Sequence, residues 1–258
     1  MDISKINGKA WDHEAENGSA WARIISKEAI EKARDGNLEL RVTIDKTIPR
    51  SWTEPLKGKR VLSLGGGGGQ QTPLLAAFGC DVATVDCSSE MIERDRKALE
   101  EYSLDADLYV HDMSSMPFFP DSSFDAAVSP VSLNFVEDIE CVYREVKRVL
   151  KNGGTYIFGI ANPALYLFDD RLLAKGKMKI RYTLPFSDSK SLSRKELEKR
   201  IAKNDTVEFS HTLDTILGSL TGMGFAITGF FSDYSSFEPI DSFLQDCYLA
   251  IRAVCRKD

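Results

Sequence analysis

Short apolar runs recur along the chain from Arg60 onward, each bounded by Gly, Asp or Pro and separated by segments of helix length. Runs this short fit strands of a sheet that is buried on both faces and joined by crossover helices. The pattern predicts five parallel strands in βαβ order, followed by two more that complete the sheet. The predicted strands are 61–64, 82–85, 108–110, 124–128, 156–160, 225–231 and 247–255.

The clearest helix is expected between the fourth and fifth strands. Apolar residues recur at helical spacing from Ile139 to Leu150, with three acidic residues at the start and three basic residues at the end. Both biases complement the helix dipole. Asn152, Gly153 and Gly154 then predict the stop.

Two regions interrupt this pattern. Residues 1–50 are polar, and the spacing of their apolar side chains predicts a helix within 20–33. Residues 162–212 combine two prolines, a basic run over 171–181 and a charged, helix-like stretch over 194–203. Neither region continues the alternation of strands and helices.

The expected fold class is therefore α/β, with a doubly wound, mostly parallel, seven-stranded, Rossmann-like sheet in a domain spanning 51–258. Residues 1–50 are expected to form an N-terminal helical extension. Residues 162–212 are expected to form a lid inserted after strand five, and a further helix is predicted around 212–220.

Composition narrows the class of protein. A length of 258 residues suits one large domain, because single cores stop growing efficiently at roughly 250 to 300 residues. No stretch approaches the ~18 to 20 consecutive apolar residues that a membrane crossing needs, and the first residues lack the apolar core of a secretory signal. Five scattered cysteines without a CxxC pair argue against disulfides and a zinc site. A soluble, cytoplasmic protein without metal or membrane is expected.

A glycine loop follows the first strand. Residues 61–64 run directly into five glycines, Gly65 to Gly69, and Gln70 and Gln71 open the next predicted helix. Strand, glycine loop and helix form the nucleotide site of doubly wound sheets. The dinucleotide pattern GxGxxG would need glycine where Gln70 or Gln71 stands, whereas GxGxG is satisfied. A merely flexible turn is the alternative reading.

Two acids follow the next strands. Asp86 ends the second strand, where a carboxylate can accept hydrogen bonds from ribose hydroxyls, although Asp is also a favoured helix cap. Asp112 follows the third strand, where it could accept the adenine amino group or serve as a turn residue. Cys87, Met91 and Met113 could line the nucleoside or belong to the core. His111 adjoins Asp112 and is interpreted as structural, because neighbouring strand positions face opposite ways.

These segments together resemble the class I S-adenosylmethionine-dependent methyltransferases, especially the methyltransferase type 11 group. The resemblance spans about 59–163 and includes Met116-Pro117-Phe118, Asp121 to Asp125 and Arg148 to Gly154. It implies that the glycine loop surrounds the methionyl part of S-adenosylmethionine, that the position of Asp86 binds ribose and that the position of Asp112 meets adenine. The expected cofactor-binding residues are Gly65, Gly66, Gly67, Gly69, Gln70, Asp86, Cys87, Met91, Asp112, Met113 and Ser129.

One position departs from the family. An acid usually stands two residues before the first motif glycine, where it helps to organise the amino end of the cofactor, and here that position is Ser63. Gln70 or Gln71 is expected to supply substitute hydrogen bonds. The chain is also similar to an uncharacterised bacterial branch with a tryptophan-containing N-terminal extension and a Gly-Gly-Gln-Gln loop.

The resemblance implies methyl transfer by in-line displacement, with S-adenosylhomocysteine as product. Such a reaction mainly needs alignment and exclusion of water, and no catalytic residue is assigned. His13 and His211 are the available imidazoles, and both are interpreted as surface residues. The alternative is a non-catalytic S-adenosylmethionine-binding sensor or partner protein. A nicotinamide-dependent oxidoreductase is disfavoured by Gln70 and Gln71.

The acceptor is expected to be a small molecule. The net charge is -6, whereas proteins that bind nucleic acid are usually basic. Ser129-Pro130-Val131-Ser132 also lacks the second proline and the aromatic residue of the motif found in methyltransferases acting on adenine, cytosine amino groups or glutamine. The basic run over 171–181 could draw in an anionic substrate or could be a solvated strand edge. A homodimer is left open.

Overall fold

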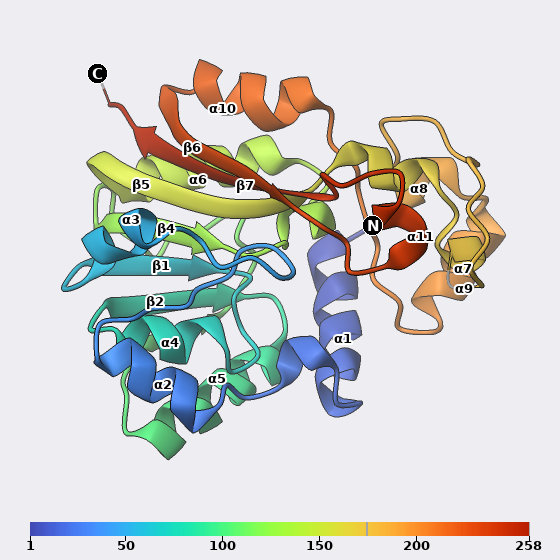
Figure 1. The fold of residues 1–258 in the computed structure, drawn as a ribbon. Helices are drawn as coiled ribbons and strands as arrows, with labels where there is room; N and C mark the ends of the chain where they lie inside the picture. Colours follow the sequence, from blue (N-terminus) through green and yellow to red (C-terminus); the bar gives the residue numbers. More distant parts are fainter. Residues whose placement is uncertain (174, 258) are drawn as a thin grey trace.

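The computed structural model describes the whole chain except residues 174 and 258, and leaves out the side chains of residues 170, 171 and 238. Its centre is a seven-stranded sheet with the strand order β3-β2-β1-β4-β5-β7-β6 (Figure 1). Strands β1 to β5 pair in parallel, whereas β7 runs antiparallel to both of its neighbours. The predicted α/β fold class is confirmed. The strands are β1 (Arg60–Leu64), β2 (Asp81–Asp86), β3 (Asp107–Val110), β4 (Phe124–Ser129), β5 (Leu150–Ala161), β6 (Phe225–Asp233) and β7 (Tyr248–Cys255).

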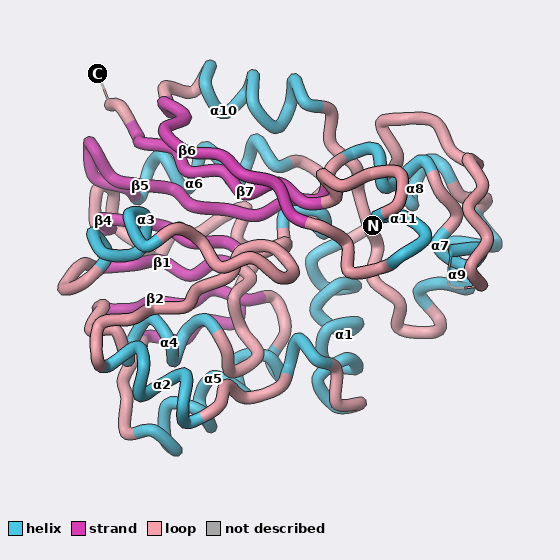
Figure 2. Tube along the Cα trace, viewed as in Figure 1, coloured by secondary structure: helices cyan, strands magenta, loops and turns pink. Residues whose placement is uncertain are grey.

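Helices flank the sheet and extend beyond its edge (Figure 2). The α-helices are α1 (Ile3–Glu16), α2 (Lys27–Arg34), α3 (Arg50–Thr53), α4 (Gln71–Ala77), α5 (Ser89–Tyr102), α6 (Ile139–Val149), α7 (Asp170–Leu173), α8 (Asp188–Ser191), α9 (Arg194–Ile201), α10 (Ser219–Gly222) and α11 (Glu238–Asp241). Short 3-10 turns are η1 (Ala20–Ala22), η2 (Glu54–Leu56), η3 (Leu133–Phe135) and η4 (Pro163–Leu167), and η5 (Asp214–Gly218) is a π-helical turn. No described helix is long and apolar enough to cross a membrane.

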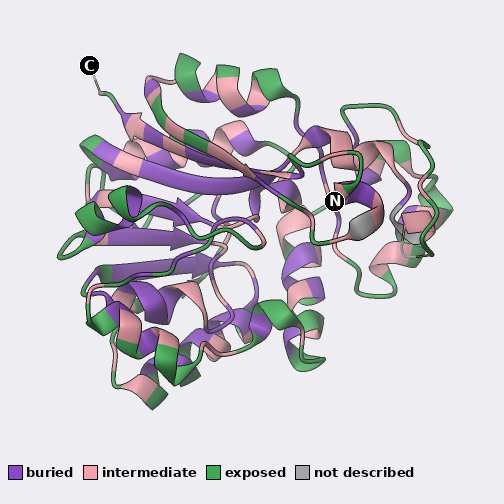
Figure 3. Cartoon of the chain, viewed as in Figure 1, coloured by how far each residue is buried: buried purple, intermediate pink, exposed green. Residues whose placement is uncertain are grey.

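The two faces of the sheet carry separate hydrophobic cores. Alternate strand residues point to opposite faces, so Leu62 joins the core that α6 and α10 cover, whereas Val61 joins the core that α2 and α4 cover. Strand β5 divides in the same way, with Phe158 on the first face and Ile157 on the second. The central strands are accordingly buried along most of their length (Figure 3). This two-sided burial explains the continuous apolar runs in the sequence.

Helix α6 forms where the sequence predicts it, but its end differs from the prediction. Asp138 caps its N-terminus and accepts a hydrogen bond from the Glu140 amide, and the helix ends at Val149. Strand β5 begins at the next residue, Leu150, and already includes Asn152, Gly153 and Gly154. The predicted glycine stop is therefore wrong, because Leu150 pairs with Phe124 of β4 and starts the strand early.

The helix predicted within 20–33 is also only partly correct. Helix α2 begins at Lys27 behind the cap Ser26, and residues 23–26 are not helical. The amide of Ile25 instead donates to the carbonyl oxygen of Gly69 at 2.8 Å. A tertiary bond to the glycine loop thus replaces the intrahelical bond that the apolar spacing suggested.

Residues that precede β1 in the chain contribute directly to the core of the sheet. Leu40 and Val42 are completely buried and belong to the cluster of α2 and α4. Helix α1 packs against α5, and its Ile3 and Ile6 contact a small apolar cluster formed by Leu197, Val207 and Phe209. Residues 162–212 therefore touch the N-terminal helix at the edge where the parallel strands end (Figure 1).

Candidate functional site

A cavity of about 870 Å³ lies at the carboxyl ends of the parallel strands. This is the position at which doubly wound sheets bind their ligands. The glycine loop after β1, the ends of β2 and β3, and the segment after β4 line one part of it. Helix α1, residues 41–44, and three residues from η4, the 202–213 loop and β7 line the rest. The cavity is thus built from both halves of the sheet and from the segments outside it.

The glycine loop is shaped by close approaches. Gly65 has a φ of 58°, which glycine adopts without the strain that a side chain brings. The amide of Gly67 donates to Asp86 Oδ2 at 3.2 Å, and a Cβ at Gly67 would lie 2.9 Å from that oxygen. Glycine at position 67 therefore lets the loop backbone reach the carboxylate of the next strand.

Asp86 is a buried carboxylate at this junction, with only 6% of its surface exposed. Its Oδ1 accepts the Ser88 amide at 2.9 Å, and its Oδ2 accepts the Gly67 amide. Burial raises the pKa of Asp86 to about 6, and the two amides act in the opposite direction. Helix α5 is capped by Ser88 and not by Asp86, so Asp86 is available to the cavity.

Asp112 and Met113 line the cavity at the end of β3. Asp112 Oδ1 accepts the amide of Ser114 at 2.8 Å and its hydroxyl at 2.7 Å, which is the geometry of a turn. The turn alternative for Asp112 is therefore observed, and the turn holds a carboxylate that also lines the cavity, so the adenine contact stays a prediction. His111 lines the cavity as well, so the argument that it faces the opposite way from Asp112 is wrong, because β3 ends at Val110 and strand alternation does not apply to residue 111.

The structure brings most of the expected cofactor-binding residues to one cavity and leaves two outside its lining. Gly69 is turned away, since its amide donates to Asp95 Oδ1 at 2.7 Å. Ser129 is fully buried, and its hydroxyl contacts the Leu64 carbonyl oxygen at 3.1 Å and Ser132 Oγ at 2.8 Å. Gly69 and Ser129 therefore stabilise the backbone around the cavity and do not face into it. The expected residues that line the cavity are Gly65, Gly66, Gly67, Gln70, Asp86, Cys87, Met91, Asp112 and Met113.

The two glutamines tie the glycine loop to the N-terminal region. Gln70 Nε2 donates to the Ala20 carbonyl oxygen and Gln71 Nε2 to the Arg41 carbonyl oxygen, both at 2.7 Å. Their amide groups are therefore engaged in holding residues 20–41 against the cavity. The Gln71 Oε1 atom is buried and has no hydrogen-bond partner among the described residues.

Helix α1 covers the junction between β2 and α5, a role that the sequence did not reveal. Asp12 Oδ1 accepts the Ser88 hydroxyl at 2.7 Å and the Glu90 amide at 2.9 Å, so it binds the first turn of α5 from another helix. Asn7 is buried and bridges Phe135 and Val207 through their carbonyl oxygens. These contacts fix α1 across the cavity. Their partners lie far apart in the chain, so no local sequence pattern could have predicted them.

Neither candidate imidazole reaches the cavity. His211 is 7% exposed, which makes its interpretation as a surface residue wrong, and its Nε2 lies 3.2 Å from the Leu133 carbonyl oxygen. Burial lowers the pKa of His211, which favours its neutral form. His13 lies on α1 and does not line the cavity either. The structure therefore assigns neither of them as a general base.

A second buried carboxylate, Asp95 of α5, holds the glycine loop from behind. Its Oδ1 accepts the Gly69 amide, and its Oδ2 lies 2.5 Å from the Thr72 hydroxyl, which in turn contacts Thr84 Oγ1 at 2.8 Å. Burial raises the pKa of Asp95 from its ordinary 3.8 to about 8. This direction favours the neutral acid at Asp95 near pH 7.

We predict that Asp95 makes stability fall as pH rises. Between about pH 4 and pH 8 the folded chain holds a proton that the unfolded chain releases, so raising the pH through this window favours unfolding, and the effect levels off above pH 8. Asp95→Asn mimics the neutral acid, because its oxygen accepts from Gly69 and its NH2 donates to Thr72. Thermal unfolding from pH 5 to 9 should show a weaker pH dependence for this variant than for the wild type.

The control for this prediction is Asp105→Asn, which removes an exposed acid. Its melting temperature should follow the wild-type pH dependence. Asp86 also has a raised pKa and contributes to the same trend in both proteins, so the comparison isolates Asp95. An Asp95→Asn curve parallel to that of the wild type would show that Asp95 is ionised in the fold.

Comparisons with known proteins identify the family. The model of the "Methyltransferase domain" family matches residues 62–158, which include the glycine loop, Asp86 and Asp112. The "Uncharacterized methyltransferase YbaJ" of Bacillus subtilis is 38% identical over 248 residues, covering 96% of both chains. The "Ubiquinone biosynthesis O-methyltransferase" of Xanthomonas campestris is 31% identical over 130 residues, or 47% of this chain and 54% of that one.

The fold has solved counterparts. The crystal structure of an S-adenosylmethionine-dependent methyltransferase from Methanosarcina mazei superposes with a TM-score of 0.58 at 25% identity, covering 78% of this chain and 93% of that one. Together with the near full-length similarity to the Bacillus subtilis protein, these findings show that the chain belongs to the class I S-adenosylmethionine-dependent methyltransferases of the type 11 group.

Proposed function

We propose that this methyltransferase transfers the methyl group to a small-molecule acceptor by in-line displacement. The observation that carries the proposal is one cavity that is lined both by the glycine loop and by a further set of side chains. A volume of about 870 Å³ lies within the roughly 300 to 1,000 Å³ of small-molecule sites. Helix α1 and two residues of the 162–212 segment, Tyr166 and Glu208, contribute to the walls of this space, which favours a ligand held inside it over a long polymer lying across it.

The residues present fit S-adenosylmethionine. Asp86 is a buried carboxylate whose two oxygens face donors, and ribose hydroxyls would add hydrogen bonds that offset its desolvation. Ser63 Oγ is fully buried and has no partner among the described residues, and the Cβ position of Gly66 lies 2.2 Å from it. Gln71 lines the cavity, so its free Oε1 is an acceptor that suits the ammonium of the methionyl group, whereas Ser63 lies behind the loop and does not line the cavity.

The cofactor supplies the chemistry, because its sulfonium carries an electrophilic methyl group. The chain is proposed to bind and orient it through Gly65 to Gly67, with Asp86 at the ribose and Asp112 at the adenine. Met113 and Cys87 provide apolar surface at the nucleoside. Helix α1 and residues 162–212 are proposed to act as the covers that exclude water, which is what a displacement at carbon needs.

Methyl transfer from radiolabelled S-adenosylmethionine tests the proposal. Wild-type protein is incubated with a bacterial extract that dialysis has divided into small molecules and macromolecules. After the labelled S-adenosylmethionine is separated from the products, we expect acid-stable label in the small-molecule fraction, and about tenfold to a hundredfold less of it when Asp86→Ala replaces the wild type at a limiting concentration of the methyl donor. Label that enters only protein or nucleic acid would contradict a small-molecule acceptor, while leaving the family assignment intact.

A further inference from the structure

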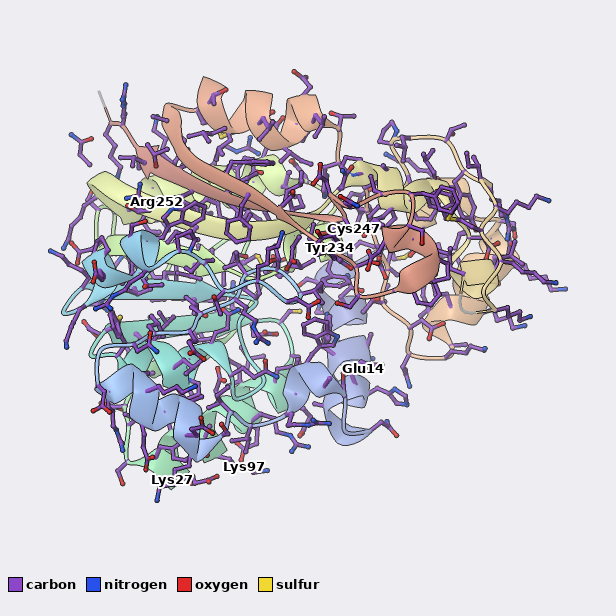
Figure 4. The ribbon with its side chains drawn as sticks, viewed as in Figure 1. Glu14, Lys27, Lys97, Tyr234, Cys247 and Arg252 are labelled. Atoms are coloured by element: carbon purple, nitrogen blue, oxygen red, sulfur yellow. The ribbon has the colours of Figure 1, made fainter. Side chains whose placement is uncertain are left out.

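The cavity ends in a group of three polar side chains that the cofactor site does not use. Tyr166 comes from η4, Glu208 from the loop after α9, and Tyr248 from the start of β7. Tyr248 pairs with Ala161 at the end of β5, and Cys247, labelled in Figure 4, immediately precedes it. Since β7 is three positions from β1 in the strand order, this group lies roughly 14 Å across the sheet from the glycine loop, at ~4.8 Å per strand.

Glu208 is held in place by its neighbours. The Tyr166 hydroxyl donates to Glu208 Oε2 at 2.9 Å, and the Thr206 hydroxyl lies 3.3 Å from Oε1. The backbone of Glu208 is fixed as well, because its amide donates to Asp188 Oδ2 at 2.8 Å. The carboxylate is therefore preorganised at the wall of the cavity and does not have to be ordered when a ligand binds.

The negative charge of Glu208 is only partly neutralised. Arg200 approaches Glu208 Oε1 at 3.4 Å, but it also lies 3.2 Å from the buried Asp188, so one guanidinium serves two carboxylates. Burial and then the charge of Glu208 raise the pKa of Tyr166 well above its usual value. Burial and then the same charge raise the pKa of Tyr248 to about 12, so both phenols remain neutral at pH 7. The group as a whole is thus acidic.

The remaining lining has the same character. Its acidic side chains outnumber its basic ones, since Arg41 is the only arginine or lysine among the described residues that line the cavity. Two of the acids are paired with cations outside the lining, Asp2 with Lys5 at 3.0 Å and Asp138 with Arg144 at 3.7 Å. The other four acids face Arg41, the amino group of Met1 and the one net positive charge that bound S-adenosylmethionine would add, which leaves a small excess of acid. Such a lining attracts cations and repels anions, and aromatic rings add to the attraction. The acids are Asp2, Asp86, Asp112, Glu137, Asp138 and Glu208, and the rings are Trp11, Trp21, Phe135, Tyr166 and Tyr248.

The basic run over 171–181 does not change this balance. Of its described side chains, Lys175, Lys177, Lys179 and Arg181, none lines the cavity. Arg181 is engaged with Asp169 and with Glu196 of α9. The expectation that this run draws in an anionic substrate therefore gains no support from its position.

We propose that Glu208, with Tyr166 and Tyr248, binds a protonated amine of the methyl acceptor at this end of the cavity. The inference rests on the proposed function, because it names the class of small molecule that the enzyme takes. Glu208 acts here as the anchor of the substrate, and the acceptor is an amine-bearing molecule and not a carboxylic acid or a phosphate. A charge-assisted hydrogen bond between the ammonium and the carboxylate supplies the selectivity.

Three probes of the same shape test the inference. Phenethylamine, phenethyl alcohol and phenylacetate differ mainly in the charge of one end, and each is titrated by calorimetry into protein saturated with S-adenosylhomocysteine. Phenethylamine should bind most tightly and phenylacetate least. Glu208→Gln keeps the shape of the side chain and should weaken phenethylamine binding about tenfold while changing phenethyl alcohol binding less than about twofold.

Asp205→Asn is the matched control, because Asp205 is an exposed acid three residues away that does not line the cavity, and it should bind all three probes like the wild type. Equal or tighter binding of phenylacetate, no detectable binding of phenethylamine, or an unchanged phenethylamine affinity in folded Glu208→Gln each overturns the inference. The wild-type ranking does not depend on any variant. Failure of S-adenosylhomocysteine to bind would instead refute the proposed function.

Discussion

Asp86→Ala is expected to weaken binding of S-adenosylhomocysteine by ~1.5 to 3 kcal/mol, or about tenfold to a hundredfold, the range for charge-assisted hydrogen bonds. The substitution removes the acceptor proposed for the ribose and also frees the amides of Gly67 and Ser88, which Asp86 holds at 3.2 and 2.9 Å. Both effects loosen the glycine loop where the cofactor is expected. Calorimetric titration of the purified variant measures the loss directly.

Asp81→Ala is the control for this prediction. Asp81 is exposed at the opposite end of the same strand, so its loss tests the general effect of removing an acid from β2. Its affinity for S-adenosylhomocysteine should stay within about twofold of the wild type. A folded Asp86→Ala protein that binds as well as Asp81→Ala would show that the ribose assignment is wrong.

Gly159→Ala is expected to destabilise the fold by about 3 kcal/mol or more. A Cβ on this residue of β5 would lie only 1.7 Å from the Val42 carbonyl oxygen and 2.6 Å from its carbonyl carbon. Both contacts are with backbone, so no rotamer change relieves them and residues 38–48 must move off the sheet. Urea unfolding followed by circular dichroism measures the loss of free energy.

Gly222→Ala is the matched control, because this glycine of α10 has no atom within 4 Å of its would-be Cβ. It should leave the free energy of unfolding unchanged or raise it by up to about 1 kcal/mol through helix propensity. If Gly159→Ala were as stable as this control, residues 38–48 would not pack on β5 as the structure places them.

The strands could be predicted because each buried strand is a short run of apolar residues in the sequence. Each of the seven predicted runs coincides with an observed strand, and the alternation of Val61 and Leu62 between two cores explains why those runs are apolar throughout. The prediction within 20–33 was only partly right, since Ile25 bonds to Gly69, which lies far along the chain. The spacing of apolar residues within a segment cannot predict such a long-range contact.

The residues of the candidate site also fall into those that the sequence could predict and those that it could not. Asp86, Asp112 and the glycines follow predicted strands, so their meeting at one edge follows from the topology of a parallel sheet. Asp12 and Asp95 act on that edge from helices, and no motif marks them. Glu208 reaches the cavity only because residues 162–212 fold back against α1. Function could be predicted where chemistry follows strand order, and not where it depends on the packing of separate segments.

The central claim is that the cavity beside the glycine loop binds the methyl donor. Titration of the wild-type protein with S-adenosylhomocysteine in a calorimeter tests it most directly, because the measurement needs neither an acceptor nor a variant. One molecule is expected to bind per chain with a dissociation constant in the micromolar range, which corresponds to about -8 kcal/mol. An absence of binding heat at several temperatures, with the protein shown to be folded, would contradict the account.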